Sequence, residues 1–507
     1  MSITSSRRRA LVVATALAAA ATCGIAMAGP TAAAPSAVTA STPVPSDFPD
    51  GMLMSYVINT KANPGQVRLA ERAVAAAGGV VVQSWPQIGV VVAHSDRATF
   101  RTAVKDNGKN AIESIGATRT ASVTEGTPEG IQTPWGPGAA AYKKGAKKPA
   151  NGDLPGEIAP GASAGDPLEN AQWDKVLIKA DQARKITEGN RNVLVGVLDS
   201  GIEADHPDLA ANIDVDTSVN CTAAGRPDTS ATGWQPTTST HGTHVAGIIA
   251  AAHNGVGLVG VAPNVRMASV KVVNDDGYIY PEYAICGFVW AGMQKMDLTN
   301  NSYYVDPFEF WCDDQPDQAA AKEAVRRAVA WSRGQGVAHV AAAGNSAYDL
   351  SNKTTDSGSP NDTTPVTRQI NAGCQDIPTE LPGVVTVSSL QQWPAGANDS
   401  RLSGFSNRGL GVIDVAAPGS RIASTVLGGG YSFLSGTSMA SPNAAGVMAL
   451  LKSTHPTWGP DQLEAGLYEQ ATPKACGTTT GGAPCVGTPE MNSYFGHGVV
   501  DALKAVQ

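Results

Sequence analysis

From residue 166 onward, short apolar runs alternate with helical patterns, and this alternation limits the possible folds more than any other feature. The run at 193–198 is continuous and apolar, which is typical of a strand buried on both faces of a sheet. Strands that alternate with helices predict an α/β domain with a parallel sheet and helices on both faces. We expect strands at 193–198, 265–273, 296–302, 337–343, 384–390 and 412–416, and helices at 241–252, 281–296, 318–333, 438–453 and 460–471.

The chain before this domain has a different order of elements. A strand, a helix, two strands, a helix and a final strand are predicted at 54–61, 66–77, 79–95, 98–106 and 111–123. This βαββαβ order predicts a small α+β domain of the ferredoxin-like type, which we place within residues 29–126. Residues 127–165 are dense in Gly, Pro, Ala and Lys and predict a flexible linker.

Residues 1–28 have the three parts of a signal peptide. They contain a basic start at 7–9, an apolar run at 10–25 and an A-x-A cleavage site at 26–28. A membrane anchor is the alternative, but the apolar run is short and no cluster of charges follows it. We therefore expect a secreted, extracellular protein without a stable membrane anchor.

Cysteine content and charge agree with export. Six cysteines remain after the signal peptide is removed, and an even number in an exported chain predicts up to three disulfides. Cys476 and Cys485 flank a short Gly/Thr-rich loop and are the first pair we expect, whereas the sequence does not fix the other pairs. The net charge of −8 and the lack of a basic stripe argue against nucleic acid as a partner.

Four polar side chains stand next to the predicted elements. Asp199 directly follows a predicted strand and Asn345 lies just after another, whereas His241 and Ser438 each begin a predicted helix. Ligands and catalytic groups in parallel sheets gather at the carboxyl ends of the strands. A serine nucleophile needs a base, a carboxylate that orients the base, and donors for the oxyanion. The sequence therefore predicts an Asp–His–Ser triad with an asparagine oxyanion donor.

Each of these residues has an ordinary alternative when it is considered alone. Ser438 is a good helix N-cap, Asn345 a common turn residue, and Asp199 a possible turn residue or magnesium ligand. His241 and His244 are spaced like metal ligands, but no acidic or cysteine partner lies at metal-site spacing nearby. We expect His244 to be a buried core histidine.

Three motifs resemble those of the subtilisin-like serine peptidases, the subtilases. They surround Asp199, His241 (H-G-T-H-V-A-G) and Ser438 (G-T-S-M-A-S-P), and Gly344 with Asn345 matches the oxyanion segment of the family. The resemblance covers about residues 166–507. It implies an endopeptidase that acts on proteins and peptides, in which Asp199 orients His241, His241 takes the proton of Ser438, and Asn345 binds the oxyanion.

The βαββαβ domain resembles the propeptide of the subtilases in pattern more than in motif. In that family the propeptide inhibits the catalytic domain and chaperones its folding. The resemblance therefore implies a self-processing zymogen with its own propeptide as an intramolecular inhibitor. We expect the protein to be a monomer.

The resemblance also implies a calcium site. Residues 252–258 match the family's calcium loop in length and character, and Asp208 matches its acidic ligand. An ordinary helix-ending N-G turn is the alternative. Oxygen ligands suit a hard cation such as calcium, and the expected ligands are Asp166, Asp208, Ala252, Asn254, Val256 and Leu258.

The substrate-binding edges differ from the family pattern. Subtilases hold an extended substrate between two backbone edges rich in glycine and serine, whereas this chain has tyrosines there. Bulky side chains predict a narrow substrate range, unless the rings turn away and pack on the insertion around Trp311 and Cys312. The expected substrate-binding residues are Gly277, Tyr278, Ile279, Tyr280, Ser302, Tyr303, Tyr304 and Gly344.

Two other functions stay open at this point. One is an exopeptidase that releases short peptides from free amino termini, which needs an acidic group for the substrate's amino terminus; the sequence assigns none. The other is a catalytically silent binding module, which the complete set of four polar residues argues against.

Overall fold

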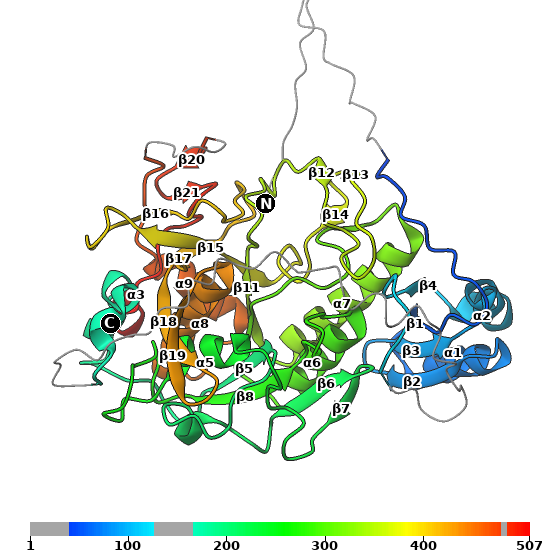
Figure 1. The fold of residues 1–507 in the computed structure, drawn as a ribbon, viewed down its shortest axis with the longest axis horizontal. Coiled ribbons are helices and arrows are strands. Elements are labelled where there is room, and N and C mark those ends of the chain that lie inside the picture. Colours follow the sequence, from blue (N-terminus) through cyan, green and yellow to red (C-terminus); the bar gives the residue numbers. More distant parts are fainter. Residues whose placement is uncertain (1–39, 126–165, 478–483) are drawn as a thin grey trace, which may run out of the picture. The chain divides into compact units, whose positions relative to one another are not determined.

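The structure, a computed structural model, describes residues 40–125, 166–477 and 484–507. The predicted signal peptide and the predicted linker at 127–165 lie outside the described residues. Figure 1 shows the arrangement of the elements.

A nine-stranded sheet is the centre of the C-terminal domain, residues 166–507. Its strands are β5 (Leu194–Asp199), β6 (Val219–Ala223), β7 (Arg226–Asp228), β8 (Arg266–Lys271), β9 (Leu298–Asn301), β11 (Ala338–Ala342), β15 (Val384–Gln392), β16 (Ser400–Leu402) and β17 (Val415–Pro418). The order is β16-β15-β11-β9-β5-β8-β6-β7, with β17 also paired to β15. Within this sheet β16 pairs antiparallel with β15, and β7 pairs antiparallel with β6. The other pairs are parallel. The predicted α/β domain with a parallel sheet is confirmed.

Helices cover both faces of this sheet. Successive side chains of a strand point to opposite faces, so Val195 and Val197 of β5 enter one core while Leu194 and Leu198 enter the other. The first core is shared with α5, α8 and α9, and the second with α6 and α7. The helices are α3 (Trp173–Leu177), α4 (Ala180–Ala183), α5 (His241–Ala250), α6 (Pro281–Met293), α7 (Pro316–Gly334), α8 (Thr437–Thr454) and α9 (Pro460–Gln470).

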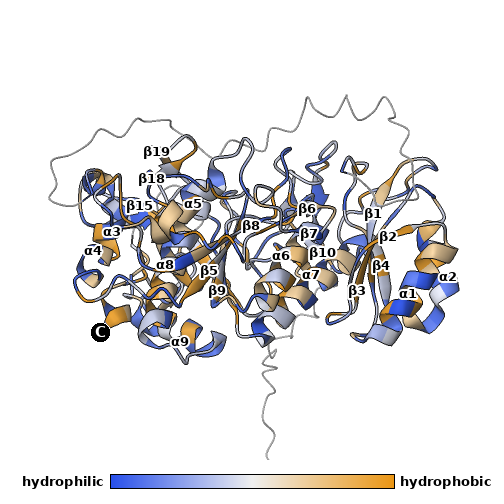
Figure 2. Cartoon of the chain, turned by 90° about the horizontal axis from the view of Figure 1, so that it is seen from below, coloured by the Kyte–Doolittle hydropathy of each residue, from blue (hydrophilic) through white to orange (hydrophobic). Residues whose placement is uncertain are grey.

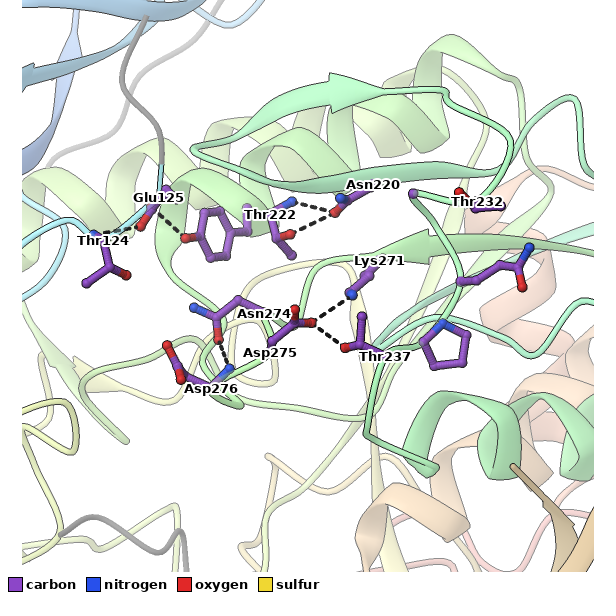
Figure 3. A pocket seen from close by; sticks show the side chains of 14 residues that line it. Thr124, Glu125, Asn220, Thr222, Thr232, Thr237, Lys271, Asn274, Asp275 and Asp276 are labelled. Carbon is purple, nitrogen blue, oxygen red and sulfur yellow. Dashed lines mark hydrogen bonds and ion pairs between the residues drawn. The ribbon is translucent and has the colours of Figure 1, made fainter. Parts of the chain in front are cut away.

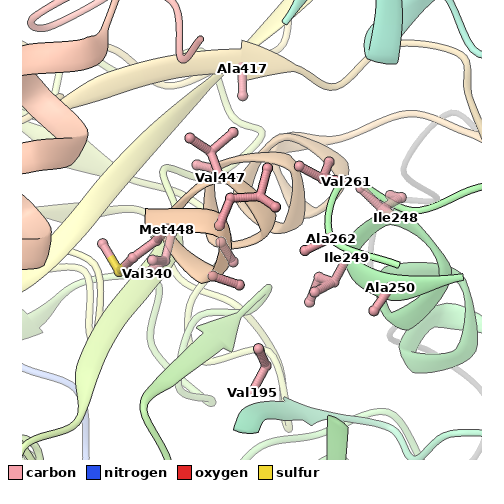
Figure 4. Packing of buried hydrophobic residues seen from close by; sticks show 14 of the residues in the cluster. Val195, Ile248, Ile249, Ala250, Val261, Ala262, Val340, Ala417, Val447 and Met448 are labelled. Atoms are coloured by element: carbon pink, nitrogen blue, oxygen red, sulfur yellow. The ribbon is translucent and has the colours of Figure 1, made fainter. Parts of the chain in front are cut away.

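Helix α8 passes through the middle of the first core. Every residue from Thr437 to Leu451 is buried, and Figure 4 shows Val447 and Met448 among side chains from the sheet and from α5. Gly446 allows a close approach, because a Cβ atom there would lie 2.5 Å from Cβ of Val261. The small residues of α8 thus fix the position of its first turn, where Ser438 stands.

The N-terminal domain, described from residue 40 to 125, has the predicted order of elements. These are β1 (Met54–Asn59), α1 (Pro64–Ala76), β2 (Val80–Trp85), β3 (Val90–Ser95), α2 (Phe100–Gly108) and β4 (Ser114–Ala117). They form an antiparallel sheet of order β2-β3-β1-β4. In Figure 2 its strands are mainly hydrophobic, whereas α1 mixes hydrophobic and hydrophilic residues.

Both faces of this small sheet are buried. Tyr56 and Ile58 of β1 pack with α1 and α2, while Val57 joins the core of α6 and α7. Polar contacts accompany this packing, since the backbone N–H of Ala117 donates to Asp317 of α7 at 3.1 Å. The N-terminal domain therefore shares a continuous hydrophobic core with the C-terminal domain.

Several short hairpins and three disulfides complete the C-terminal domain. The sequence patterns did not predict the hairpins, because paired segments this short show no clear alternation. The disulfides join Cys221 to Cys286, Cys312 to Cys374 and, as expected, Cys476 to Cys485. The hairpin strands are β12 (Thr355–Asp356) with β13 (Arg368–Gln369), β18 (Ile422–Val426) with β19 (Gly430–Leu434), and β20 (Gly487–Thr488) with β21 (Met491–Asn492). A further antiparallel pair joins β10 (Trp311–Cys312) to β14 (Cys374–Gln375), which lie far apart in the sequence. In the part of the chain that the structure describes, no helix combines the length and apolar character needed to span a bilayer.

Candidate active site

Three neighbouring strands bring the predicted site residues to one edge of the sheet. Leu198 of β5 is in register with Asn301 of β9, and Asn301 is in register with Ala341 of β11. Asp199 and Ser302, the next residues, therefore leave the sheet at the same level. The turn that holds Asn345 leaves β11 at this edge too.

The aspartate and the histidine of the predicted triad are in direct contact. His241 Nδ1 lies 2.8 Å from Asp199 Oδ1 and 3.0 Å from Oδ2. The Asp199 side chain is 1% exposed and that of His241 is 28% exposed, so the imidazole covers the carboxylate and borders solvent. His244 is buried as predicted, its Nε2 lies 3.2 Å from the Ser432 carbonyl, and burial lowers its pKa to about 3.

Ser438 and Ser302 are joined by two hydrogen bonds. The hydroxyl of Ser438 donates to the Ser302 carbonyl at 3.1 Å, and the Ser302 hydroxyl donates to the Ser438 carbonyl at 2.9 Å. Next to Ser302, burial and then the Asp199 charge raise the pKa of Tyr303 well above its ordinary value. Helix α8 also packs on α5, which begins with His241. Asp199 and His241 are thus in contact, and Ser438 is bonded to Ser302 at the same edge of the sheet.

Two N–H donors flank the backbone of Gly436. The side-chain oxygen of Asn345 accepts from the N–H of Thr437 at 2.8 Å and from its hydroxyl at 2.9 Å. This fixes the amide so that its Nδ2 lies 3.5 Å from the place where a Cβ atom of residue 436 would stand. The backbone N of Ser438 lies 3.6 Å from the same point. Glycine at 436 leaves this space open between two donors, as an oxyanion site requires.

The turn at Gly344 and Asn345 is held by Asn407, which the sequence analysis did not single out. Asn407 Nδ2 donates to the Ala343 carbonyl at 2.8 Å, and its Oδ1 accepts the N–H groups of Ser346 and Tyr348. Gly344 has φ +98, and a Cβ atom there would lie 2.3 Å from Asn407 Nδ2. The F-S-N-R-G segment at 405–409 is a weaker match to the subtilase pattern, and it did not indicate this role.

The predicted cation ligands come together in one loop. Asp166 and Asp208 are buried, and the Asp166 carboxylate accepts the backbone N–H groups of Asn254 and Gly255. Asp208 Oδ2 accepts the N–H of Leu258 at 3.0 Å, while its Oδ1 has no hydrogen-bond partner among the described residues. Burial raises the pKa of Asp208 to about 6. A buried carboxylate oxygen without a donor fits a bound cation.

Among the remaining predicted ligands of this loop, the Asn254 side chain is already hydrogen-bonded. The side-chain oxygen of Asn254 accepts the N–H of Val256 at 2.9 Å, and its amide nitrogen donates to the Pro207 carbonyl. The Gly257 carbonyl accepts from Leu168, and Gly257 is not one of the predicted ligands. Ala252 donates its N–H to the Asp208 carbonyl. An ion at this loop would compete with the hydrogen bond of the Asn254 side chain.

The first predicted substrate edge is partly covered by the chain itself. Asp306 accepts the N–H of Ile279 at 2.6 Å, and the Ile279 carbonyl accepts the N–H of Asp306 at 2.8 Å. Both backbone groups of Ile279 are therefore used by the insertion after β9. Gly277 has φ +90, and a Cβ atom there would meet no neighbour within 4 Å.

One tyrosine of each edge contacts Asn361, which lies in the connection between β11 and β15. The hydroxyl of Tyr278 donates to the Asn361 carbonyl at 3.1 Å, and the Asn361 amide donates to the Tyr304 hydroxyl at 3.0 Å. Tyr303 donates its hydroxyl to Asn301 at 3.1 Å. The edges are thus lined by rings that are fixed at their hydroxyl ends.

Comparisons with known proteins agree with this geometry. The model of the Subtilase family matches residues 190–498, which is more than half of the chain. The chain belongs to the subtilase family. It is 34% identical over 281 residues to subtilisin E of Bacillus subtilis, which is 55% of this chain and 61% of that protein. It is 34% identical over 316 residues to the subtilisin of Bacillus pumilus, covering 62% of this chain and 91% of that subtilase.

Solved structures show the same fold. The epidermin leader peptide processing serine protease of Staphylococcus aureus superposes with a TM-score of 0.63 at 21% identity, covering 90% of this chain and 98% of that one. Fervidolysin of Fervidobacterium pennivorans gives a TM-score of 0.60 at 23% identity, covering 90% of this subtilase and 61% of the other.

Proposed function

We propose that the protein is a serine endopeptidase that hydrolyses peptide bonds in proteins through Asp199, His241, Ser438 and Asn345. The observation that carries this proposal is the contact between His241 Nδ1 and both oxygens of Asp199, at the sheet edge where Ser438 begins α8. Membership of the subtilase family supports the same assignment.

The reaction follows from these positions. Ser438 Oγ attacks the peptide carbonyl carbon and its proton passes to His241, while the buried carboxylate of Asp199 holds the imidazole and stabilises its charged form. Asn345 Nδ2 and the Ser438 N–H donate to the developing oxyanion in the space beside Gly436. His241 then gives the proton to the leaving amine, and water hydrolyses the acyl ester with His241 again acting as base.

The protein is, in this proposal, a secreted zymogen that is processed by its own active site. We assign the N-terminal domain a role as chaperone and inhibitor of the C-terminal domain. The shared hydrophobic core with α6 and α7 supports this role. Processing within 126–165 would release the N-terminal domain. The three disulfides of the described residues agree with an oxidising, extracellular location.

A structural calcium ion belongs to the same proposal. Asp166, Asp208 and Asn254, with the carbonyls of Ala252, Val256 and Leu258, would hold it. Bound calcium would neutralise two buried carboxylates and tie the start of the C-terminal domain to the end of α5.

An exopeptidase is the second candidate, and one observation favours it. Asp306 is hydrogen-bonded to the backbone N–H and carbonyl of Ile279. These two groups cannot then pair with substrate residues upstream of the scissile bond, which shortens the edge available to the substrate. Cleavage of peptides with free or acetylated amino termini separates the two. An endopeptidase cleaves both, whereas an exopeptidase that reads the amino terminus loses the acetylated peptide.

Labelling of the secreted protein with a fluorophosphonate tests the chemistry directly. We expect the label on Ser438 and none in Ser438→Ala. Ser441→Ala is the matched control, because Ser441 lies one turn further along α8 with its hydroxyl donating to Asn300 at 2.7 Å. Equal labelling of wild type and Ser438→Ala would refute the proposed nucleophile.

A further inference from the structure

A buried arginine of the N-terminal domain enters a pocket at the start of α6. The side chain of Arg119 is 1% exposed and forms an ion pair with Glu282, which is 0% exposed. The guanidinium carbon lies 3.7 Å from the centre of the Tyr280 ring. The geometry combines a carboxylate with an aromatic face, the two groups that bind a guanidinium best.

The two oxygens of the Glu282 carboxylate differ in their hydrogen bonds. Oε1 of Glu282 is bonded to the guanidinium, while Oε2 is buried and has no hydrogen-bond partner within the described residues. Glu125, the second carboxylate on Arg119, lies in the N-terminal part at 2.7 Å. Release of that part would remove Arg119 and Glu125 together and leave Glu282 without its cation.

The backbone next to Arg119 is also held by the C-terminal domain. Asp362 accepts the N–H of Thr120 at 2.9 Å and the N–H of Ala121 at 3.0 Å, and it also accepts the Thr120 hydroxyl. Asp362 is itself buried, with 5% exposure. The pocket and Asp362 thus recognise an arginine together with the two backbone N–H groups that follow it.

A cavity of about 400 Å³ borders this place, and Glu125 and Tyr283 belong to its lining. Figure 3 shows Glu125 at its wall. The Tyr283 hydroxyl donates to the Glu125 carboxylate at 2.6 Å. Tyr283 also lies beside the guanidinium, its hydroxyl 3.4 Å from Arg119. Glu125 thus lines the cavity and binds Arg119 at the same time.

We propose that the released C-terminal domain uses Tyr280, Glu282, Tyr283 and Asp362 to bind an arginine-containing segment of its protein substrate. This inference rests on the proposed peptidase function and on release of the N-terminal domain. The position favours a substrate as the occupant, because Tyr280 belongs to a predicted substrate edge. Asn361, the neighbour of Asp362, is bonded to the tyrosines of both edges.

The test compares matched peptides with the processed enzyme. A series of quenched fluorescent peptides carries one arginine at successive distances from the cleaved bond, and each has a twin with citrulline, which has the same shape but no charge. At one spacing we expect kcat/KM for the arginine peptide to exceed that of its twin by roughly tenfold, mainly through KM, because a charged hydrogen bond is gained away from the reacting atoms.

Two substitutions test whether Glu282 and Tyr280 are the source of this preference. Glu282→Gln should remove the preference for arginine while cleavage of the citrulline peptide stays within about twofold, since it changes only the charge. Glu125→Gln is the matched control: it removes the other carboxylate on Arg119 but departs with the N-terminal domain, so the preference should persist. If Glu282→Gln gives no processed enzyme, Tyr280→Leu replaces it, and the ratio between twin peptides should fall.

These experiments distinguish an error in the arginine pocket from an error in the proposed peptidase function. Normal fluorophosphonate labelling with equal cleavage of arginine and citrulline peptides at every spacing would refute the pocket alone. A preference that survives Glu282→Gln and Tyr280→Leu would refute it too. No labelling and no cleavage of any peptide would refute the peptidase, and this inference with it.

Discussion

The cluster around Ser438 and the cluster around Arg119 are both buried and polar, but they are assembled from different kinds of sequence. Asp199, His241 and Ser438 each stand at the end of a regular element, inside a short motif. Arg119 lies after β4, whereas its partner Glu282 is in the first turn of α6. Asp362 belongs to a long connection without a motif.

In our proposals the first cluster performs the chemistry and the second recognises an arginine of another chain. Strand register alone brings Asp199 level with Ser302, so the reacting groups are placed by the sheet. Arg119 reaches Glu282 because the N-terminal domain packs on α6 and α7. We infer that the first cluster depends on the register of β5 and β9, whereas the second depends on the N-terminal domain and on the connection that carries Asp362. Variants of both clusters and of the regions beside them test this contrast.

Ser438→Ala should lower kcat by about 10⁶-fold, the size measured for the corresponding serine in subtilisin itself. Because processing uses the same site in our proposal, the variant should accumulate as a precursor that retains the N-terminal domain. Gel analysis and N-terminal sequencing of the secreted product measure this. Normal maturation in a host without other proteases would show that processing does not depend on Ser438.

Arg119→Met in the Ser438→Ala precursor should lower the free energy of unfolding by about 3–5 kcal/mol, because Glu282 is then buried without a cation. Adding Glu282→Gln should restore part of this loss. Denaturant unfolding of the single and double variants measures both. Arg72→Met, on an exposed arginine of the same domain, is the control, and an equal effect of the two single variants would contradict the assignment.

Asn345→Ala should lower kcat by about 10²–10³-fold with KM nearly unchanged, a magnitude known from the oxyanion asparagine of subtilisin itself. Asn345→Asp keeps the acceptor for Thr437 but lacks the N–H donor, so it should lose at least as much. Steady-state kinetics on one peptide compare the variants. Turnover at the level of the wild type would remove Asn345 from the oxyanion site.

Chelation should lower the melting temperature of the wild type by roughly 5 °C, since an ion bound only to the folded state stabilises it. Asp208→Ala should melt lower without chelator and should not respond to it. Asp205→Ala, on an exposed residue three positions earlier, should still respond. Identical melting of the wild type with and without chelator, with no metal in the purified protein, would exclude the calcium site.

Tyr304→Gly should widen the range of residues accepted upstream of the cleaved bond by a modest factor, roughly two- to fivefold in kcat/KM for bulky side chains. In this hypothesis the ring narrows the edge next to Ser302, where its hydroxyl accepts the amide N–H of Asn361. Profiling of a peptide library by wild type and variant measures this. Broad and indistinguishable profiles would mean that the ring does not limit the substrate.

The amino-acid sequence was sufficient to predict the α/β domain, the order of elements in both domains, and the motifs that place Asp199, His241, Ser438 and Asn345. It was sufficient because buried parallel strands have an unmistakable apolar pattern and because the carboxyl ends of such strands meet at one edge. The pair Cys476–Cys485 was predictable for a similar reason, since only a short loop separates the two residues.

Only the tertiary structure determines which groups bond to the predicted substrate edges and which groups contact Arg119. Ile279 and Asp306 are bonded across an insertion, and Glu282 meets Arg119 across 163 positions of sequence. Local patterns carry no signal for such contacts, because a buried glutamate and an exposed one look alike in a helix. The contacts arise only when two separately patterned surfaces pack and exclude water from the charges between them.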